Sequence, residues 1–247
     1  MAPRYFDKYT LVLSLKTTLT RAYPMTKLRL LSVQFDTPIE PWELPAFRGA
    51  VAAKAGLEHD LFHNHDNETG GFHYRLPLIQ YKQDRGLPML VCLNEGIEEL
   101  HHFFSEPDWT LNLKGRQAPV RIHKLDVQQY NLGAWDKSFR YHLRDWIGLR
   151  DENYGIYTRL DGMVERLSHL QNVLQKQLDA LLQQLDCTPE KPVQVKIQEI
   201  KRERWVSFKG VKVLAFSLEF TANVALPNYI GLGKGCSMGW GVLKGLR

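Results

Sequence analysis

The chain has few cysteines and no long apolar run, and each absence excludes a class of protein. Its 247 residues include three cysteines, Cys92, Cys187 and Cys236, with no close pair among them. A disulfide framework and a CxxC metal site are therefore excluded, and a reducing cytosol fits this cysteine content. No apolar stretch approaches the roughly 20 residues of a membrane-spanning helix. These absences predict a cytoplasmic protein with no membrane partner.

The common nucleotide-binding motifs are missing as well. A P-loop requires GxxxxGK[ST], which does not occur. A GxGxxG fingerprint that starts at Gly231 fails because its last position is Cys236, and no βαβ unit follows it. A dinucleotide site is therefore excluded.

Acidic residues are scarce in the last quarter of the chain. From Lys191 onward there are ten basic and three acidic residues, a net charge of +7, whereas the whole chain carries +5. The preceding part therefore sums to about −2. This asymmetry predicts that the natural ligand of the C-terminal part is an anion.

A frame of glycines lies in this basic part, in the stretch NYIGLGKGCSMGWGVLKGLR. The glycines of this frame are Gly231, Gly233, Gly235, Gly239 and Gly241, and Lys234 lies between the second and the third. Glycine supplies positive φ in tight hairpins, which explains one or two of these residues. Five glycines in eleven residues favour a backbone that lies close to a ligand, since successive N–H groups can form a nest for phosphate oxygens.

The first half of the chain has the hydrophobic pattern of a ferredoxin-like domain, an antiparallel sheet with two helices on one face. We expect its elements in the order β, α, β, β, α, β, at residues 9–20, 44–56, 72–83, 87–93, 94–104 and 118–130. Asn94 is expected to cap the second helix. Residues 9–20 read as a strand because charged residues interrupt the apolar stretch, which a signal peptide would not allow.

The second half repeats this order loosely. We expect a strand at 139–147, a helix at 160–185, strands at 193–208 and 211–224, and then the glycine frame. The helix carries an apolar stripe from Leu160 and Val164 to Leu185 that should pack on its own sheet, because it is too short for a coiled coil. The predicted fold is α+β, with two tandem ferredoxin-like (RRM-like) domains at 1–130 and 131–247 and a C-terminal glycine-rich loop.

The stretch GLGKGCSMGWG resembles the C-terminal glycine-rich loop of the CRISPR repeat-processing endoribonucleases, the sixth Cas family of the repeat-associated (RAMP) superfamily. The loop spacing, its position, the chain length and the predicted architecture all match that family. The resemblance implies a prokaryotic, cytoplasmic antiviral-defence enzyme that cleaves precursor CRISPR RNA within its repeats to make guide RNAs. It implies attack by the RNA 2′-OH, giving a 2′,3′-cyclic phosphate and a 5′-OH, with no metal and no cofactor.

The family carries its catalytic histidine in the loop after the first helix, which is here LEHDLFHNHDNETGGFHYR. His63 and His65 are the leading candidates, because histidine has a pKa near neutral and can transfer protons. His59 fits the helix end and His73 a strand, and the HH pair at 101–102 receives no role. A zinc site at His63 and His65 lacks a convincing third ligand.

Two further groups of residues complete the candidate site. Tyr81 could position the 2′-OH and Lys82 could neutralise phosphate, although tyrosines in amphipathic strands are commonly packing residues. The basic stretch KIQEIKRERWVSFK offers Lys201, Arg202, Arg204 and Trp205 for the RNA backbone and an unpaired base. A charged strand edge facing water explains it equally well.

The expected partner is CRISPR repeat RNA in its precursor and processed forms, with other effector subunits or a second copy of the chain left open. Three alternatives also stay open. One is a non-catalytic RNA-binding subunit of the same superfamily. The second is a metal-dependent nuclease built on His63 and His65. The third is an unrelated α+β enzyme whose glycine turn binds a small phosphorylated ligand.

Overall fold

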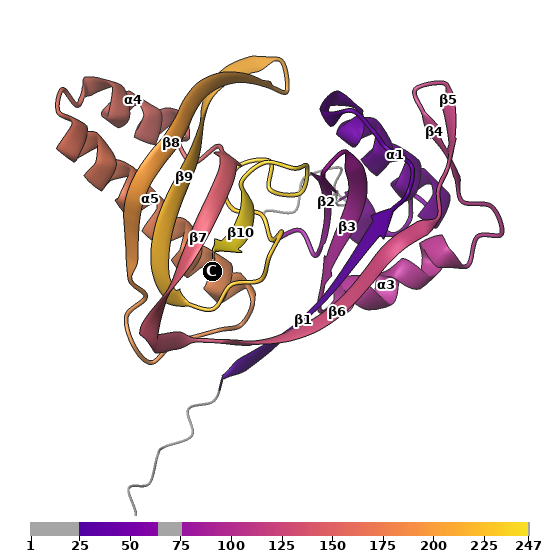
Figure 1. Cartoon of the computed structure of the whole chain (residues 1–247), viewed down its shortest axis with the longest axis horizontal. Helices are drawn as coiled ribbons and strands as arrows, with labels where there is room; N and C mark the ends of the chain where they lie inside the picture. The colour runs from indigo at the N-terminus through magenta and orange to yellow at the C-terminus, as the bar shows by residue number, and fades with distance from the viewer. Residues whose placement is uncertain (1–24, 64–75, 247) are drawn as a thin grey trace, which may run out of the picture.

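The structure is a computed structural model that describes residues 25–63 and 76–246. The strand expected at residues 9–20 lies outside this range. Two four-stranded antiparallel sheets stand side by side along the long axis of the molecule (Figure 1). Within the described ranges, no helix combines the length and the apolar character that crossing a membrane requires.

The first sheet has the strand order β2-β3-β1-β6. Its strands are β1 (Thr26–Phe35), β2 (Ile79–Asp84), β3 (Leu87–Leu93) and β6 (Ile122–Leu132). Helices α1 (Leu44–Ala55) and α3 (Glu95–Phe104) connect them, with η1 (Pro41–Glu43), α2 (Asp60–His63) and the hairpin of β4 (Thr110–Leu113) and β5 (Arg116–Pro119) as shorter elements. If the four strands are numbered 1 to 4 by their order along the chain, their spatial order in the sheet is 2-3-1-4. This is the strand order of a ferredoxin-like domain.

The helices of this domain form because each buries one apolar stripe against the sheet. Phe47 of α1 and Phe103 of α3 are both fully buried, and each makes an edge-to-face contact with Phe35 at 5.9 Å between ring centroids. The expected Asn94 cap is wrong in its detail. Asn94 is the N-cap residue of α3, but its side chain makes no cap bond and accepts the backbone N–H of Arg29 at 3.1 Å.

The second sheet has the order β10-β7-β9-β8, which is the same arrangement. Its strands are β7 (Ala134–Trp146), β8 (Val195–Phe208), β9 (Val211–Val224) and β10 (Val242–Leu246), and its helices are α4 (Asp151–Arg159) and α5 (Met163–Gln184). No described helix stands between β9 and β10; the glycine-rich stretch takes that place. The predicted α+β fold of two ferredoxin-like domains with a glycine-rich loop is confirmed.

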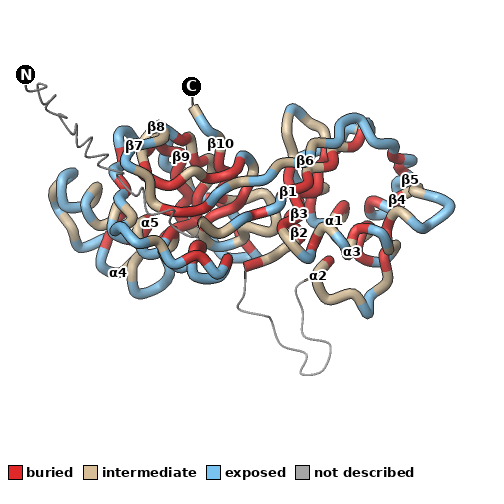
Figure 2. Tube along the Cα trace, turned by 90° about the horizontal axis from the view of Figure 1, so that it is seen from below, coloured by how far each residue is buried: buried red, intermediate tan, exposed pale blue. Residues whose placement is uncertain are grey.

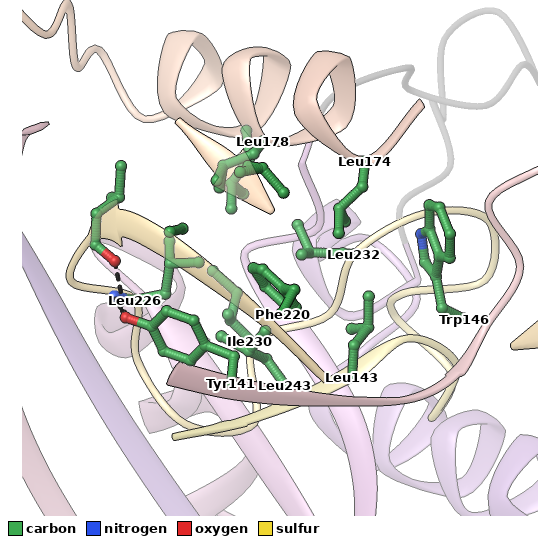
Figure 3. Close-up of a cluster of buried hydrophobic side chains, with 14 of the residues drawn as sticks. Tyr141, Leu143, Trp146, Leu174, Leu178, Phe220, Leu226, Ile230, Leu232 and Leu243 are labelled. Atoms are coloured by element: carbon green, nitrogen blue, oxygen red, sulfur yellow. Dashed lines mark hydrogen bonds between the residues drawn. The ribbon is translucent and has the colours of Figure 1, made fainter. Parts of the chain in front are cut away.

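The predicted leucine stripe is confirmed from Leu167 to Leu185, whereas Leu160 lies before α5, at the C-terminal end of α4. Figure 3 shows Leu174 and Leu178 extending from the helix toward Leu232 and the sheet. Val164, expected in the stripe, is 75% exposed, because the apolar face that meets the sheet begins later in the helix. The sequence pattern also failed to predict β1, α4 and the β4–β5 hairpin.

The two domains share buried side chains. One apolar cluster contains Leu28 and Val91 of the first sheet together with Leu226, Ile230 and Leu232, which follow β9 in the second domain. Figure 2 shows buried positions concentrated along the strands of both sheets, with more exposed positions along α4 and the β4–β5 hairpin. The domains are therefore held by a common core as well as by the chain that links them.

The glycine-rich loop is attached to the edge strand β2 of the first sheet. Tyr81 donates its N–H to the carbonyl of Ser237 at 2.7 Å and forms an isolated parallel bridge with Met238. The side-chain oxygen of Gln80 accepts the N–H of Gly231 at 2.9 Å, and Lys82 donates to the carbonyl of Cys236. In Figure 1 this C-terminal segment lies between the two sheets.

We call these contacts of β2 with residues 231–238 the latch. Further polar contacts extend it, since Asp84 accepts bonds from Lys244 at 2.6 Å and from the Tyr229 hydroxyl at 2.9 Å. Because Tyr81 and Lys82 are both 0% exposed, their polar atoms depend on these partners.

Glycine at position 241 is required by a close approach of two backbone segments. Gly241 has φ +58°, and a Cβ there would overlap the carbonyl oxygen of Leu232. The N–H of Leu232 in turn donates to the Gly241 carbonyl at 2.9 Å. Any side chain at position 241 would break this pair.

We predict that Gly241→Ala destabilises the protein by more than about 3 kcal/mol, through steric overlap added to backbone strain. Gly210→Ala is the matched control, because Gly210 has φ +80° but no heavy atom within 4 Å of the place that a Cβ would take. It should cost only about 1–2 kcal/mol, the strain of a left-handed alanine. Urea unfolding of both variants measures the difference, and equal losses would contradict the packing argument.

Burial of Lys82 predicts a pH-dependent stability. Desolvation lowers the pKa of Lys82 from 10.5 to about 8. Between these values the unfolded chain binds more protons than the native one, so the stability of the native state rises with pH. The unfolding free energy of the wild type relative to Lys82→Met should increase by on the order of 3 kcal/mol from pH 8 to pH 10.5.

The measurement is urea unfolding at several pH values, with Lys212→Met on the exposed part of β9 as control. The free-energy difference between wild type and the control variant should show no comparable rise. A pH-independent difference between wild type and Lys82→Met would contradict the inferred burial of the charge.

Candidate active site

A cavity of about 350 Å³ opens beside the latch, between the two domains. We call it the loop cavity. The first domain contributes α1, the end of α2 and residues 76–77, and the second contributes α5, the β8–β9 turn and the glycine loop. The residues that line it are Arg48, His63, Leu76, Pro77, Arg150, Gln177, Ala180, Leu181, Gln184, Phe208, Lys209 and residues 231–238.

The charge of the loop cavity is positive. Four cationic side chains line it, Arg48, Arg150, Lys209 and Lys234, and no acidic residue is among its described lining residues. They come from four separate parts of the chain, so folding alone brings them together. A cavity with this lining attracts an anion such as a phosphodiester.

The β8–β9 turn places Lys209 at the cavity wall. Lys209 and Gly210 have φ values of 52° and 80°, the signature of a two-residue type I′ hairpin turn. The neighbouring Phe208 ring lies 5.5 Å from the Lys234 ammonium group. This cation–π contact holds the Lys234 side chain against the end of β8, next to the β8–β9 turn.

His63 is held at the cavity by backbone contacts on both sides. It is the last residue of α2, its carbonyl accepts a bond from Arg48, and its Nε2 lies 2.8 Å from the carbonyl oxygen of Leu57. A carbonyl can only accept, so the neutral ring carries its proton on Nε2 and Nδ1 is the basic nitrogen. His63 thus lies at the cavity beside the cations, and its catalytic role stays a prediction.

His65, the other expected catalytic histidine, lies outside the described residues. Tyr81 and Lys82, also expected as catalytic residues, do not line the loop cavity. The Tyr81 hydroxyl donates to the carbonyl of Phe62 at 2.8 Å, and burial raises its pKa. Their place in the latch favours a structural role, and a catalytic role for them stays a prediction.

The expected RNA-binding glycines divide into two sets. Gly231 and Gly241 are buried, and their N–H groups donate to Gln80 and to the carbonyl of Asp145. Gly233 and Gly235 line the loop cavity beside Lys234. Packing requires glycine in both sets, because a Cβ at Gly233 would meet Ile147 and Trp146 and one at Gly235 would meet Phe208 and Trp240. A contact of these glycines with RNA stays a prediction.

The basic stretch on β8 lies mostly away from the cavity. Lys201 pairs with Glu199 at 2.5 Å and Glu219 at 3.2 Å, and Trp205 is 57% exposed against Tyr154. Lys201, Arg202 and Trp205 do not line the loop cavity, so their RNA contact stays a prediction.

A second cavity of about 690 Å³ is lined in part by the glycine loop. It shares Phe208, Lys209 and Met238 with the loop cavity and adds Gly239 and Trp240. Its cations include Arg144 and Arg204, and Arg204 pairs with Asp145 at 2.9 Å. Trp42, 70% exposed, forms part of its rim.

Sequence reasoning missed two of the four cavity cations. Arg48 lies in an alanine-rich helix and Arg150 follows the end of β7, and neither belongs to a local basic cluster. Burial lowers the pKa of Arg48, although a guanidinium stays charged in proteins. Only the tertiary arrangement identifies these two residues.

Solved structures similar to this chain have the same architecture. One titled Crystal structure of Cas6b aligns with a TM-score of 0.81 and 24% identity, over 89% of this chain and all of that chain. A second, titled Crystal structure of CRISPR RNA processing endoribonuclease Cas6b, aligns with a TM-score of 0.68 and 23% identity over the same shares. At this level of identity, the likeness concerns the fold.

Sequence comparison adds two results. The Uncharacterized protein MJ0978 of Methanocaldococcus jannaschii is 30% identical over 132 residues, which are 53% of this chain and 88% of that protein. The family model for the Cas6b N-terminal domain matches residues 26–131, and the model for the Cas6b C-terminal domain matches residues 133–246. The chain therefore belongs to the Cas6b family.

Proposed function

We propose that this protein is an endoribonuclease that cleaves precursor CRISPR RNA within its repeats and releases guide RNAs. The observation that carries the proposal is the loop cavity, which combines His63 with four cations and the glycine loop. Membership of the Cas6b family supports the substrate class, and one similar solved structure is itself titled a CRISPR RNA processing endoribonuclease.

The chemistry uses the nucleophile that RNA itself carries. His63 Nδ1 takes the proton of the 2′-OH next to the cleaved phosphodiester, and the hydroxyl oxygen attacks phosphorus. The bond from phosphorus to the 5′-oxygen breaks, and this oxygen takes a proton from water, giving a 2′,3′-cyclic phosphate and a 5′-OH. The step requires no metal, because alignment and proton transfer supply the rate acceleration.

The cations act on the phosphate. Arg48, Lys209 and Lys234 reach the loop cavity from different directions, so they can neutralise the charge that grows on the non-bridging oxygens. Gly233 and Gly235 line the same cavity and bring the loop backbone to this group. The cations and the loop backbone thus both act on the phosphate group of the RNA.

The RNA strand extends from the loop cavity into the second cavity. Phe208, Lys209 and Met238 line both, so one strand can pass from one to the other across the tip of the glycine loop. The exposed Trp42 offers a surface on which an unpaired base can stack.

Removal of the proton-transfer group should nearly abolish cleavage. We expect His63→Ala to reduce single-turnover cleavage of a labelled repeat RNA from the same genome by about 10²–10⁴-fold in EDTA, with RNA affinity retained. His123→Ala, on the exposed β6 strand, is the control and should cleave like wild type. His65→Ala is measured in parallel.

The same assay includes RNA with a 2′-deoxy substitution at the mapped cut, which should stay intact. Product analysis should find the cyclic phosphate. Binding of wild type without cleavage would replace the proposal by a non-catalytic RNA-binding subunit. Cleavage that is lost in EDTA would indicate a metal-dependent nuclease, and a lack of repeat binding would exclude the RNA substrate.

The cavity cations should contribute to the affinity for RNA independently of the nucleotide sequence. Lys209→Ala and Lys234→Ala are each expected to weaken repeat binding and to lower the slope of log K against log salt by about 1. Lys114→Ala, in the exposed β4–β5 turn, should leave the slope unchanged. Filter binding at several salt concentrations measures the slopes, and equal slopes for all variants would contradict the assignment.

A further inference from the structure

Three side chains with metal-binding groups meet on the outside of the first domain, away from the loop cavity lining. His59 lies in the turn between α1 and α2, and Glu99 and His102 lie one turn apart on α3. From sequence, His59 was expected to belong to the helix end, and His102 had no expected role. The cluster cannot be recognised from sequence, because His59 lies forty residues before Glu99.

The fold brings the three together through two local features. Gly56 ends α1 with φ +108°, and the turn then returns His59 N–H to the Gly56 carbonyl at 3.2 Å. Helix α3 buries Leu100 and Phe103 against the sheet, which leaves Glu99 and His102 toward that turn. The glycine and the apolar stripe therefore determine the position of the cluster.

The ligand atoms are close enough to share one ion. Glu99 Oε2 lies 3.5 Å from His59 Nδ1 and 3.9 Å from His102 Nε2, and the three ligand atoms all lie within 4.8 Å of one another. Tetrahedral zinc with bonds of about 2.0–2.1 Å needs ligand atoms roughly 3.4 Å apart. The stacked His59 and His102 rings, 3.4 Å apart between centroids, must rotate out of this stack to direct their nitrogens at one ion.

The surroundings favour a divalent cation. Glu58 Oε1 lies 3.9 Å from His59 Nε2 and adds a second carboxylate to that of Glu99. The side chains of His59, Glu99 and His102 are 23%, 32% and 29% exposed, so an ion can enter from water. Two imidazoles and one carboxylate suit zinc, nickel or cobalt, whereas magnesium prefers oxygen ligands alone.

We propose that His59, Glu99 and His102 form a binding site for a zinc-class divalent ion, with water in the fourth position. The ion ties the turn before α2 to α3. Because the His59 carbonyl accepts the N–H of Phe62, this turn also begins the helix that ends at His63. The site therefore stabilises the segment that carries the candidate catalytic histidine, and it takes no part in the cleavage step.

The test is titration of the untagged, chelator-treated protein with zinc chloride and, separately, magnesium chloride by calorimetry. We expect one zinc ion per chain, no magnesium binding, and a melting temperature that rises with zinc concentration. Glu99→Gln and His102→Ala should each weaken zinc binding about 100-fold or more, beyond the roughly 10–100-fold effect of losing a supporting contact. Their melting without zinc shows whether they fold.

His101→Ala is the matched control. The His101 ring lies 3.8 Å from the His102 ring, but its Nδ1 bonds the carbonyl of Glu98 and it is not among the three ligand residues. It should bind zinc like wild type. X-ray absorption of the zinc-loaded wild type provides a readout that needs no variant and should find two imidazole ligands. Failure to bind zinc, equal binding by His102→Ala and His101→Ala, or an absorption spectrum without imidazole would each overturn the proposal. Because none of these readouts involves RNA, the outcome is independent of the cleavage assay.

Discussion

The pairing between the β2 edge and residues 231–238 is the constraint on which the arrangement of this molecule depends. It joins two sheets that are far apart in the chain, and it gives the buried Lys82 and Gln80 their polar partners. The loop cavity exists because this pairing holds the glycine loop across from α1 and α2. If the domains were displaced, the cations of the two domains would move apart and would no longer line one cavity.

The cavity takes its chemistry from both halves of the chain. The first domain supplies His63 and Arg48, and the second supplies the loop and the β8–β9 turn. Neither ferredoxin-like sheet holds the complete set. In the second domain the glycine-rich stretch replaces the second helix of the pattern, and this segment can therefore reach the other sheet. Repetition of one simple fold thus produces an asymmetric site at the junction.

The sequence predicted the fold well because the strands and helices carry strong apolar periodicity. The bounds of β9 at Val211–Val224 follow directly from its apolar run between two turn signals. The strand β1 was missed because the apolar pattern at residues 9–20 also reads as a strand. For the site, the glycine spacing indicated the loop and the histidine-rich stretch indicated His63. Arg48 and Arg150 could not be predicted, since each is an isolated arginine whose neighbours exist only in three dimensions. The burial of Lys82 in the latch could not be predicted either, because sequence does not reveal which face of an edge strand another domain covers.

The wide separation of the latch residues in sequence affects how the chain is made. Gln80 and Gly231 are 151 residues apart, and Lys82 and Cys236 are 154 apart. At typical rates of synthesis the first domain leaves the ribosome on the order of ten seconds before the segment that completes it. During that interval β2 is an open sheet edge, which is a template for aggregation. Lys82 is then a charged lysine on an exposed edge, the feature by which sheet proteins discourage pairing with another chain. Lys82, which is buried in the native protein, thus opposes aggregation through β2 until the ribosome has synthesised the glycine loop.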